Sequence, residues 1–200
     1  MVLLFLCALN EQRKSKTILN YNEQDTTSLQ TIQELVTALK EEERTTYTKI
    51  IQSLDLPASA LKPFASWSNE CYTRNCIINT DKFELILICW EKEQFTSIHG
   101  HNGEECWIKV IQGEFKETIY QLDEIEELQA IRTSISAEGD SSYMIDFMGF
   151  HRLENSNNKR SMSLHLYAKP IRSCQLFDEN LNKFVRKDLT YHTISELGTD

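Results

Sequence analysis

The chain has 200 residues, 40% of them hydrophobic, and a formal net charge of −9. A chain of this length fits one domain and can bury a substantial core. The negative charge argues against a nucleic-acid partner, because phosphate-binding surfaces need clustered lysine and arginine.

Residues 1–9 form an apolar run that resembles the core of a secretory signal but has no basic segment before it. The run is too short to span a bilayer as a helix, and no later stretch is long and apolar enough to do so. We therefore predict no membrane partner and interpret residues 1–26 as a docked or disordered extension. A signal or a membrane-surface anchor is the alternative.

Two amphipathic helices are predicted next, within about residues 27–66. Thr27 is placed to cap the first helix, with Gln30 reaching back to it as in a capping box. The second helix is expected to end at residues 55–57, where a proline stands. Both apolar stripes have helical spacing and predict core packing. They are Leu29, Ile32, Leu35, Val36 and Leu39, then Tyr47, Ile50, Ile51 and Leu54.

Short runs rich in β-branched and aromatic residues, separated by polar turns, follow Pro63. This pattern is typical of a barrel. We predict a mainly β fold, a jelly-roll β-barrel over about residues 67–192 with a small N-terminal helical region, in one domain of residues 27–200. The expected strands are 72–79, 83–90, 95–101, 106–112, 114–120, 131–135, 142–147, 151–155, 161–167, 173–178 and 184–191.

The histidine pattern predicts a metal site. His99 and His101 are one residue apart, so on an extended strand both side chains point to the same side. A third imidazole, His151, can join them from a neighbouring strand. Three neutral imidazoles leave open positions on a metal, which suits catalysis better than structural zinc. The alternative is an exposed strand pair or satisfied core histidines, and we interpret His192 as a surface residue.

The expected strand 161–167 places Ser163, His165 and Tyr167 on one face, opposite three apolar residues. These groups can form a relay, from the Ser163 hydroxyl to His165 and from His165 to the Tyr167 phenol. The alternative is a half-exposed strand with a polar outer face.

These patterns resemble the cupins, and within them the cysteine dioxygenases. A cupin has two histidines separated by one residue, then a glutamate, and a glycine after six further residues. Here Cys106 stands where the glutamate would, six residues before Gly113, and loss of that carboxylate marks the thiol dioxygenase branch. The resemblance covers about residues 28–192. It continues through Tyr72–Asn75, Leu87–Trp90, Ser97–His99, Leu153–Asn155 and Ser163–Tyr167.

The resemblance implies a cupin-type jelly roll that holds one Fe(II) per chain on His99, His101 and His151. It also implies L-cysteine and O2 as substrates, with cysteine sulfinic acid as the product of cysteine catabolism. The catalytic residues it implies are Tyr167, His165, Ser163 and Cys106. We expect a monomer.

Arg74 is the residue expected to select the substrate, because a guanidinium matches a carboxylate in bidentate geometry. Tyr72, on the same face, can add a hydroxyl. Family members that act on mercaptopropionate or cysteamine generally lack this arginine, so its presence favours cysteine. In animal members the residues corresponding to Cys106 and Tyr167 become joined by a thioether. Gly100 replaces an aspartate of those members, and its position faces away from the ligands.

Three alternatives remain open at this point. One is a thiol dioxygenase with another specificity, and another is a cupin that only binds a metal or a small ligand. A zinc hydrolase is also conceivable, although Glu104 and Glu105 are poorly placed as bases.

Six cysteines are scattered along the chain with no C-x-x-C pair. A chain of this size can do without disulfides, so we predict reduced thiols and a cytoplasmic protein. The six are Cys7, Cys71, Cys76, Cys89, Cys106 and Cys174.

Overall fold

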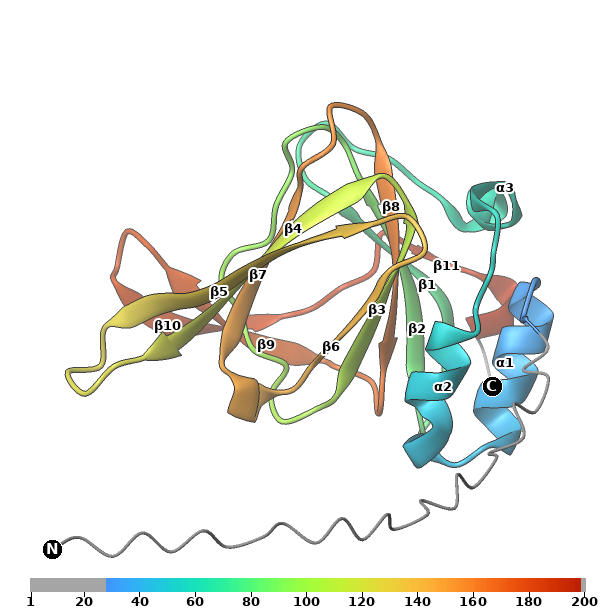
Figure 1. Cartoon of the computed structure of the whole chain (residues 1–200), viewed down its shortest axis with the longest axis horizontal. Coiled ribbons are helices and arrows are strands. Elements are labelled where there is room, and N and C mark those ends of the chain that lie inside the picture. The colour runs from blue at the N-terminus through green and yellow to red at the C-terminus, as the bar shows by residue number, and fades with distance from the viewer. Residues whose placement is uncertain (1–27, 199–200) are drawn as a thin grey trace, which may run out of the picture.

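The computed structural model describes residues 28–198 (Figure 1). The predicted extension over residues 1–26 and the predicted cap Thr27 lie outside the described residues. Among residues 28–198, no helix is long and apolar enough to cross a membrane.

The first helix, α1 (Ile32–Glu41), begins later than the sequence pattern suggested. Its cap is Thr31, whose hydroxyl accepts a hydrogen bond from the Glu34 backbone N–H at 3.1 Å. The Glu34 carboxylate accepts in return from the Thr31 N–H at 3.0 Å. The predicted partner Gln30 is therefore wrong. A carboxylate also suits the positive end of the helix dipole better than an amide does.

The helices cover one face of the largest sheet. Tyr47 packs edge-on against Trp107 with ring centroids 5.7 Å apart, and the Trp107 ring N–H donates to the Thr48 hydroxyl at 2.9 Å. Burial of the predicted apolar stripes against this sheet forms the outer core. After α1 come η1 (Arg44–Thr46), α2 (Tyr47–Gln52), α3 (Ala58–Leu61) and η2 (Lys62–Phe64).

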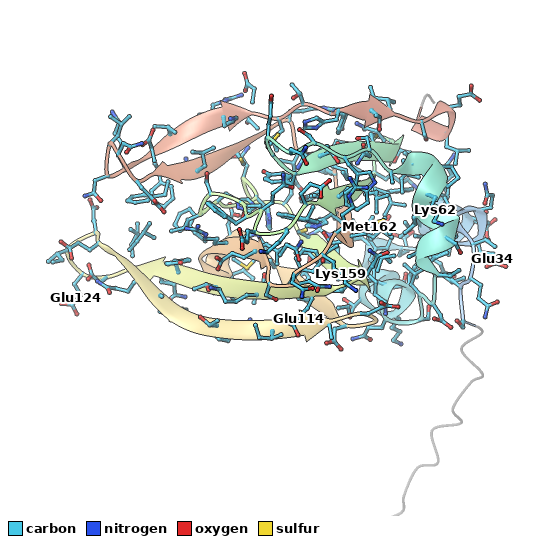
Figure 2. The ribbon with its side chains drawn as sticks, turned by 90° about the horizontal axis from the view of Figure 1, so that it is seen from above. Glu34, Lys62, Glu114, Glu124, Lys159 and Met162 are labelled. Atoms are coloured by element: carbon cyan, nitrogen blue, oxygen red, sulfur yellow. The ribbon has the colours of Figure 1, made fainter. Side chains whose placement is uncertain are left out.

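The strands form a six-stranded sheet in the order β11-β1-β2-β8-β3-β6, a three-stranded sheet β5-β4-β7 and the hairpin β10-β9. In Figure 2 the β4–β5 hairpin and the β9–β10 hairpin flank the interior on opposite sides. The bounds are β1 (Thr73–Asn79), β2 (Glu84–Trp90), β3 (Cys106–Gln112), β4 (Glu114–Leu122), β5 (Leu128–Ala137), β6 (Ser141–Met144), β7 (Phe150–Asn155), β8 (Ser161–Tyr167), β9 (Ser173–Asp178), β10 (Lys183–Asp188) and β11 (Thr193–Ile194).

A second, inner core lies between the facing sheets. Trp90 of β2 meets Phe115 of β4 edge to face, with ring centroids 5.4 Å apart. Buried side chains of β2, β3 and β8 complete this core. The predicted fold, a mainly β cupin-type jelly-roll barrel with a small N-terminal helical region, is confirmed.

Residues 95–101 differ from the prediction of a regular strand. They make only isolated bridges, in which Phe95 pairs with Glu154 and His99 pairs with both His151 and Leu176. The segment is shared between β7 and β9, so neither strand forms a continuous ladder with it.

Candidate metal centre and active site

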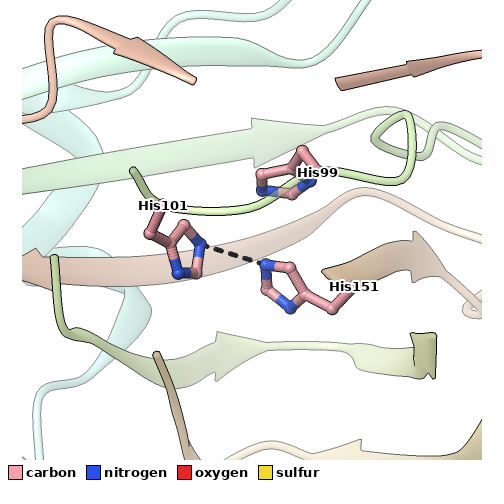
Figure 3. Close-up of side chains that lie close together, drawn as sticks. All are labelled: His99, His101 and His151. Carbon is pink, nitrogen blue, oxygen red and sulfur yellow. Dashed lines mark hydrogen bonds between the residues drawn. The ribbon is translucent and has the colours of Figure 1, made fainter. Parts of the chain in front are cut away.

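The three predicted histidines meet inside the barrel (Figure 3). His99 and His101 come from the bridging segment, and His151 comes from β7. The backbones of His99 and His151 exchange two hydrogen bonds, each 2.9 Å, so the two residues lie directly opposite. One nitrogen from each of the three rings lies within 4.8 Å of the others. This is a three-histidine donor set of the kind that binds a transition metal.

Outer partners fix which ring nitrogens face the shared space. The His99 Nδ1 lies 2.9 Å from the Ser97 carbonyl, which can only accept, so Nδ1 carries the proton. The His151 Nδ1 lies 2.7 Å from a carboxylate oxygen of Glu117. Both rings therefore keep an Nε2 lone pair. The Nε2 atoms of His151 and His101 are 3.1 Å apart.

Burial favours the neutral form of these rings. Desolvation, followed by the neighbouring His151, lowers the pKa of His99 to about 3. The same causes lower the pKa of His101 well below its usual value. Neutral imidazole is the form that binds a metal, so the residues fit a bound metal ion.

Two carboxylates that the sequence interpretation missed support the ligands. Asp146 accepts hydrogen bonds from the backbone N–H groups of His101 and Gly103, both at 2.6 Å. Glu117 holds His151. The available signal was a charged residue at position 117, between the apolar positions 115 and 119 of the expected strand, which share its face.

Glycine has a defined role at two positions near the ligands. Gly149 has φ +114°, and a Cβ there would lie 2.2 Å from the Tyr120 carbonyl oxygen, so only glycine fits the turn into β7. A Cβ on Gly100 would lie 3.2 Å from the Asp146 carboxylate. A side chain at position 100 therefore points toward Asp146, as expected for a position that faces away from the ligands.

Arg74 and Tyr72 line the same pocket of about 360 Å³ as the three histidines. Arg74 is 8% exposed; burial raises the pKa of the Tyr167 phenol well above its usual value, and the charge of Arg74 opposes that rise. Its Nε and Nη2 atoms are buried and have no hydrogen-bond partner among the described residues. These two nitrogens form the side-on edge of the guanidinium, the edge that pairs with a carboxylate through two parallel hydrogen bonds.

The predicted relay is formed in part. The Trp90 ring N–H donates to the Ser163 hydroxyl at 2.9 Å, and that hydroxyl lies 2.8 Å from the His165 Nε2. The His165 Nδ1, however, faces the Cys106 sulfur at 4.0 Å rather than the Tyr167 phenol.

The pocket mouth carries residues outside the predicted site. His192 is exposed, as expected of a surface residue, but its Nδ1 accepts a hydrogen bond from the Arg74 backbone at 3.1 Å. Its other ring nitrogen lies 3.9 Å from the Cys71 sulfur. Cys174 also lines the pocket. The cysteines of the described region are all free thiols, in agreement with the prediction for those positions.

Solved structures of low sequence identity resemble this chain. One is a Klebsiella pneumoniae protein with a double-stranded β-helix domain, which is 16% identical with a TM-score of 0.45, covering 54% of this chain and 80% of that one. Another is an RmlC-like cupin from Desulfovibrio desulfuricans, which is 15% identical with a TM-score of 0.41, covering 54% and 91%.

Sequence comparison identifies named relatives. Human cysteine dioxygenase type 1 is 31% identical over 134 residues, which are 65% of this chain and 67% of the human protein. The Danio rerio protein of the same name is 35% identical over 121 residues, which are 58% and 60% of the two chains. The sequence model of the family described as cysteine dioxygenase type I matches residues 18–180. Because this match spans more than half of the chain, the chain belongs to the cysteine dioxygenase type I family.

Proposed function

We propose that this chain is an Fe(II)-dependent cysteine dioxygenase that converts L-cysteine and O2 into 3-sulfinoalanine, with both oxygen atoms added to sulfur. The observation that carries the proposal is the side-on edge of Arg74. Its Nε and Nη2 are buried and unpartnered in the pocket that also contains the three histidines. An arginine placed in this way favours a substrate with both a carboxylate and a metal-binding group.

His99, His101 and His151 would hold the ferrous ion, one per chain. The ion would supply O2 activation and would lower the pKa of a coordinated thiol, as metal ions do. The neutral ligand set favours an anionic thiolate at the open positions, because no carboxylate belongs to it.

Arg74 would bind the substrate carboxylate and fix its distance from the metal. A buried guanidinium without an acceptor is costly, and a carboxylate ligand removes that cost. Tyr72 lines the same pocket, and its ring packs at a tilt against Trp90, with ring centroids 4.8 Å apart. Cysteamine has no carboxylate, and mercaptopropionate has no amine. These two compounds therefore test the alternative specificities directly.

Tyr167 would donate a hydrogen bond to the substrate or to dioxygen. Burial raises the pKa of this phenol well above its usual value, so it keeps its proton. Arg74 and Tyr167 line the same pocket, so the phenol would lie near a carboxylate bound by Arg74. The Cys106 thiol would pack against the Tyr167 ring and limit its movement. Burial raises the pKa of this thiol, so it stays protonated.

Ser163 and His165 of β8 would form a hydrogen bond that fixes the orientation of the His165 ring. The Ser163 oxygen accepts from Trp90, and its own proton would point to the His165 Nε2, 2.8 Å away. His165 would then carry its proton on Nδ1, which faces the Cys106 sulfur. We propose that these residues keep Cys106 and Tyr167 aligned rather than passing a proton to the phenol.

The test is anaerobic purification, metal analysis, and oxygen uptake with L-cysteine, mercaptopropionate and cysteamine in parallel. We expect one iron per chain and uptake that depends on L-cysteine, with 3-sulfinoalanine as the product. Preferred turnover of either analogue would support a different thiol dioxygenase. Iron binding without uptake would support a non-catalytic cupin. The monomeric state and the cytoplasmic location stay predictions.

A further inference from the structure

Glu117 lies on the strand beside the one that carries His151. Strands β4 and β7 are antiparallel, and Ile119 is the register partner of His151. Glu117 is two residues before Ile119, so it is on the same face and diagonal to His151, within reach of a long side chain. Its carboxylate oxygen is 2.7 Å from the His151 Nδ1, and the two side chains are 5% and 2% exposed.

The Glu117 side chain is buried behind a candidate metal ligand, where its oxygen can accept the Nδ1 proton of a neutral His151. A neutral imidazole with its proton on Nδ1 keeps its Nε2 lone pair for a metal ion. An acidic side chain therefore lies inside the barrel, against the back of a metal ligand.

The three candidate ligands differ in the hydrogen-bond partner of their Nδ1 atoms. The Nδ1 of His151 faces a carboxylate, whereas the Nδ1 of His99 faces the neutral Ser97 carbonyl. The Nδ1 of His101 is buried and has no hydrogen-bond partner among residues 28–198. Because an anionic acceptor makes the opposite ring nitrogen more basic than a neutral one does, the donor strengths are graded.

We infer that Glu117 is a positioning residue that fixes His151 as an Nε2 ligand and makes it the strongest of the three donors. Through His151, the Glu117 carboxylate would increase the electron density at a metal whose ligand set contains no carboxylate. The inference rests on the metal site of the proposed function and adds a residue to it.

The direct test compares Glu117→Gln and Glu117→Ala with the unmodified protein. Glutamine keeps the shape and an acceptor oxygen but loses the charge. The quantity measured is the dissociation constant of Fe(II), by anaerobic competition with a coloured chelator and without substrate. We expect Glu117→Gln to weaken binding about 10- to 100-fold and Glu117→Ala to weaken it at least as much. The Fe(III)/Fe(II) potential should also become more positive, because the lost anion stabilises the ferric state more.

Glu154→Gln is the matched control. Glu154 is a carboxylate on β7 that pairs with Lys116 of β4 at 2.7 Å, in the same strand pair but away from the ligands. It should leave the dissociation constant unchanged. If Glu117 were only structural, Glu117→Gln would lower the melting temperature while its folded fraction bound Fe(II) as tightly as the unmodified protein. That result would overturn the inference.

A second measurement needs no variant. In protein loaded with diamagnetic Zn(II), ¹H–¹⁵N spectra of the imidazoles should show a protected Nδ1 proton on His151, further downfield than that of His99. An exchangeable proton on the His151 Nε2, or a weaker hydrogen bond on His151 than on His99, would overturn the inference. The proposed function is judged separately, because unmodified protein that oxidises cysteine keeps that function whatever the Glu117 variants do.

Discussion

Cys106 and Tyr167 lie directly opposite each other as register partners on the antiparallel strands β3 and β8. Side chains in such a pair have Cβ atoms about 4.5–5.5 Å apart, which brings a cysteine sulfur to the ring of the facing tyrosine. The Cys106 thiol interacts with the Tyr167 side chain. The geometry therefore favours the thioether that the family resemblance implied.

We predict that this thioether forms during turnover with iron, cysteine and oxygen. Mass spectrometry should find a joined peptide that contains both residues and is lighter by two hydrogens than the separate peptides. Cys106→Ser should lose this species but keep partial activity, because the phenol remains in the pocket. Tyr167→Phe should lose more activity. Only separate peptides after prolonged cycling would show that the two residues are neighbours without a bond.

The sequence interpretation identified these two positions because both are tied to short-range patterns. Cys106 follows the histidine pair at a fixed spacing, and Tyr167 ends an alternating strand, so period-two geometry was enough to assign its face. The diagonal contact between Glu117 and His151 depends on the register of β4 against β7. That register is set by packing between segments more than thirty residues apart.

The same reasoning accounts for the difference at residues 95–101. Alternation correctly assigned His99 and His101 to one side, because the backbone there is extended. Alternation could not show that the segment divides its hydrogen bonds between β7 and β9. The predicted hydrogen bond from His165 to the Tyr167 phenol was wrong for a related reason. The ring has two nitrogens, and only the packing of Cys106 against it shows which group each one meets.

Replacement of a metal ligand by alanine should remove both bound iron and activity. We expect His101→Ala to disturb the rest of the protein least. The His101 Nδ1 has no hydrogen-bond partner in the described part of the chain, so the change leaves no partner unsatisfied there. His151→Ala should also lower stability, because it leaves Glu117 buried without its partner, and His99→Ala should behave like His101→Ala in iron content. Metal analysis and circular dichroism of each variant check this. Full iron occupancy with normal turnover in His151→Ala would remove it from the ligand set.

Arg74→Gln should raise the Michaelis constant for L-cysteine and greatly reduce the preference for L-cysteine over cysteamine. The lost interaction is a charge-assisted, buried pair worth about 2–5 kcal/mol. Turnover of cysteamine, which has no carboxylate to bind, serves as the internal control and should change little. The ratio of kcat/KM for the two substrates is the measurement, and an unchanged ratio would mean that another group recognises the carboxylate.

Glu84 should make the stability of the protein depend on pH. Its side chain is fully buried, at 0% exposure, next to the Tyr191 hydroxyl, and it accepts at 3.4 Å from the Ile171 backbone N–H. Burial raises the pKa of this carboxyl from 4.5 to about 7, although Arg74 and Arg172 oppose the shift. The folded state therefore binds a proton that the unfolded state has released between about pH 4.5 and 7. The contribution of protonated Glu84 to the free energy of unfolding is complete below that range and is lost as the pH rises through 7.

Glu84→Gln should remove this dependence, because the amide keeps the shape and cannot ionise. A shift of about 2.5 units corresponds to roughly 3 kcal/mol as an upper bound, so the variant should gain stability relative to the unmodified protein as the pH rises from 5 to 8. Urea unfolding at both pH values measures this difference and cancels the titration of the other groups. Glu154→Gln removes a partly exposed charge and should show no comparable trend. A Glu84→Gln advantage that is equal at pH 5 and pH 8 would mean that Glu84 is ionised throughout this range, with Arg74 and Arg172 compensating its burial.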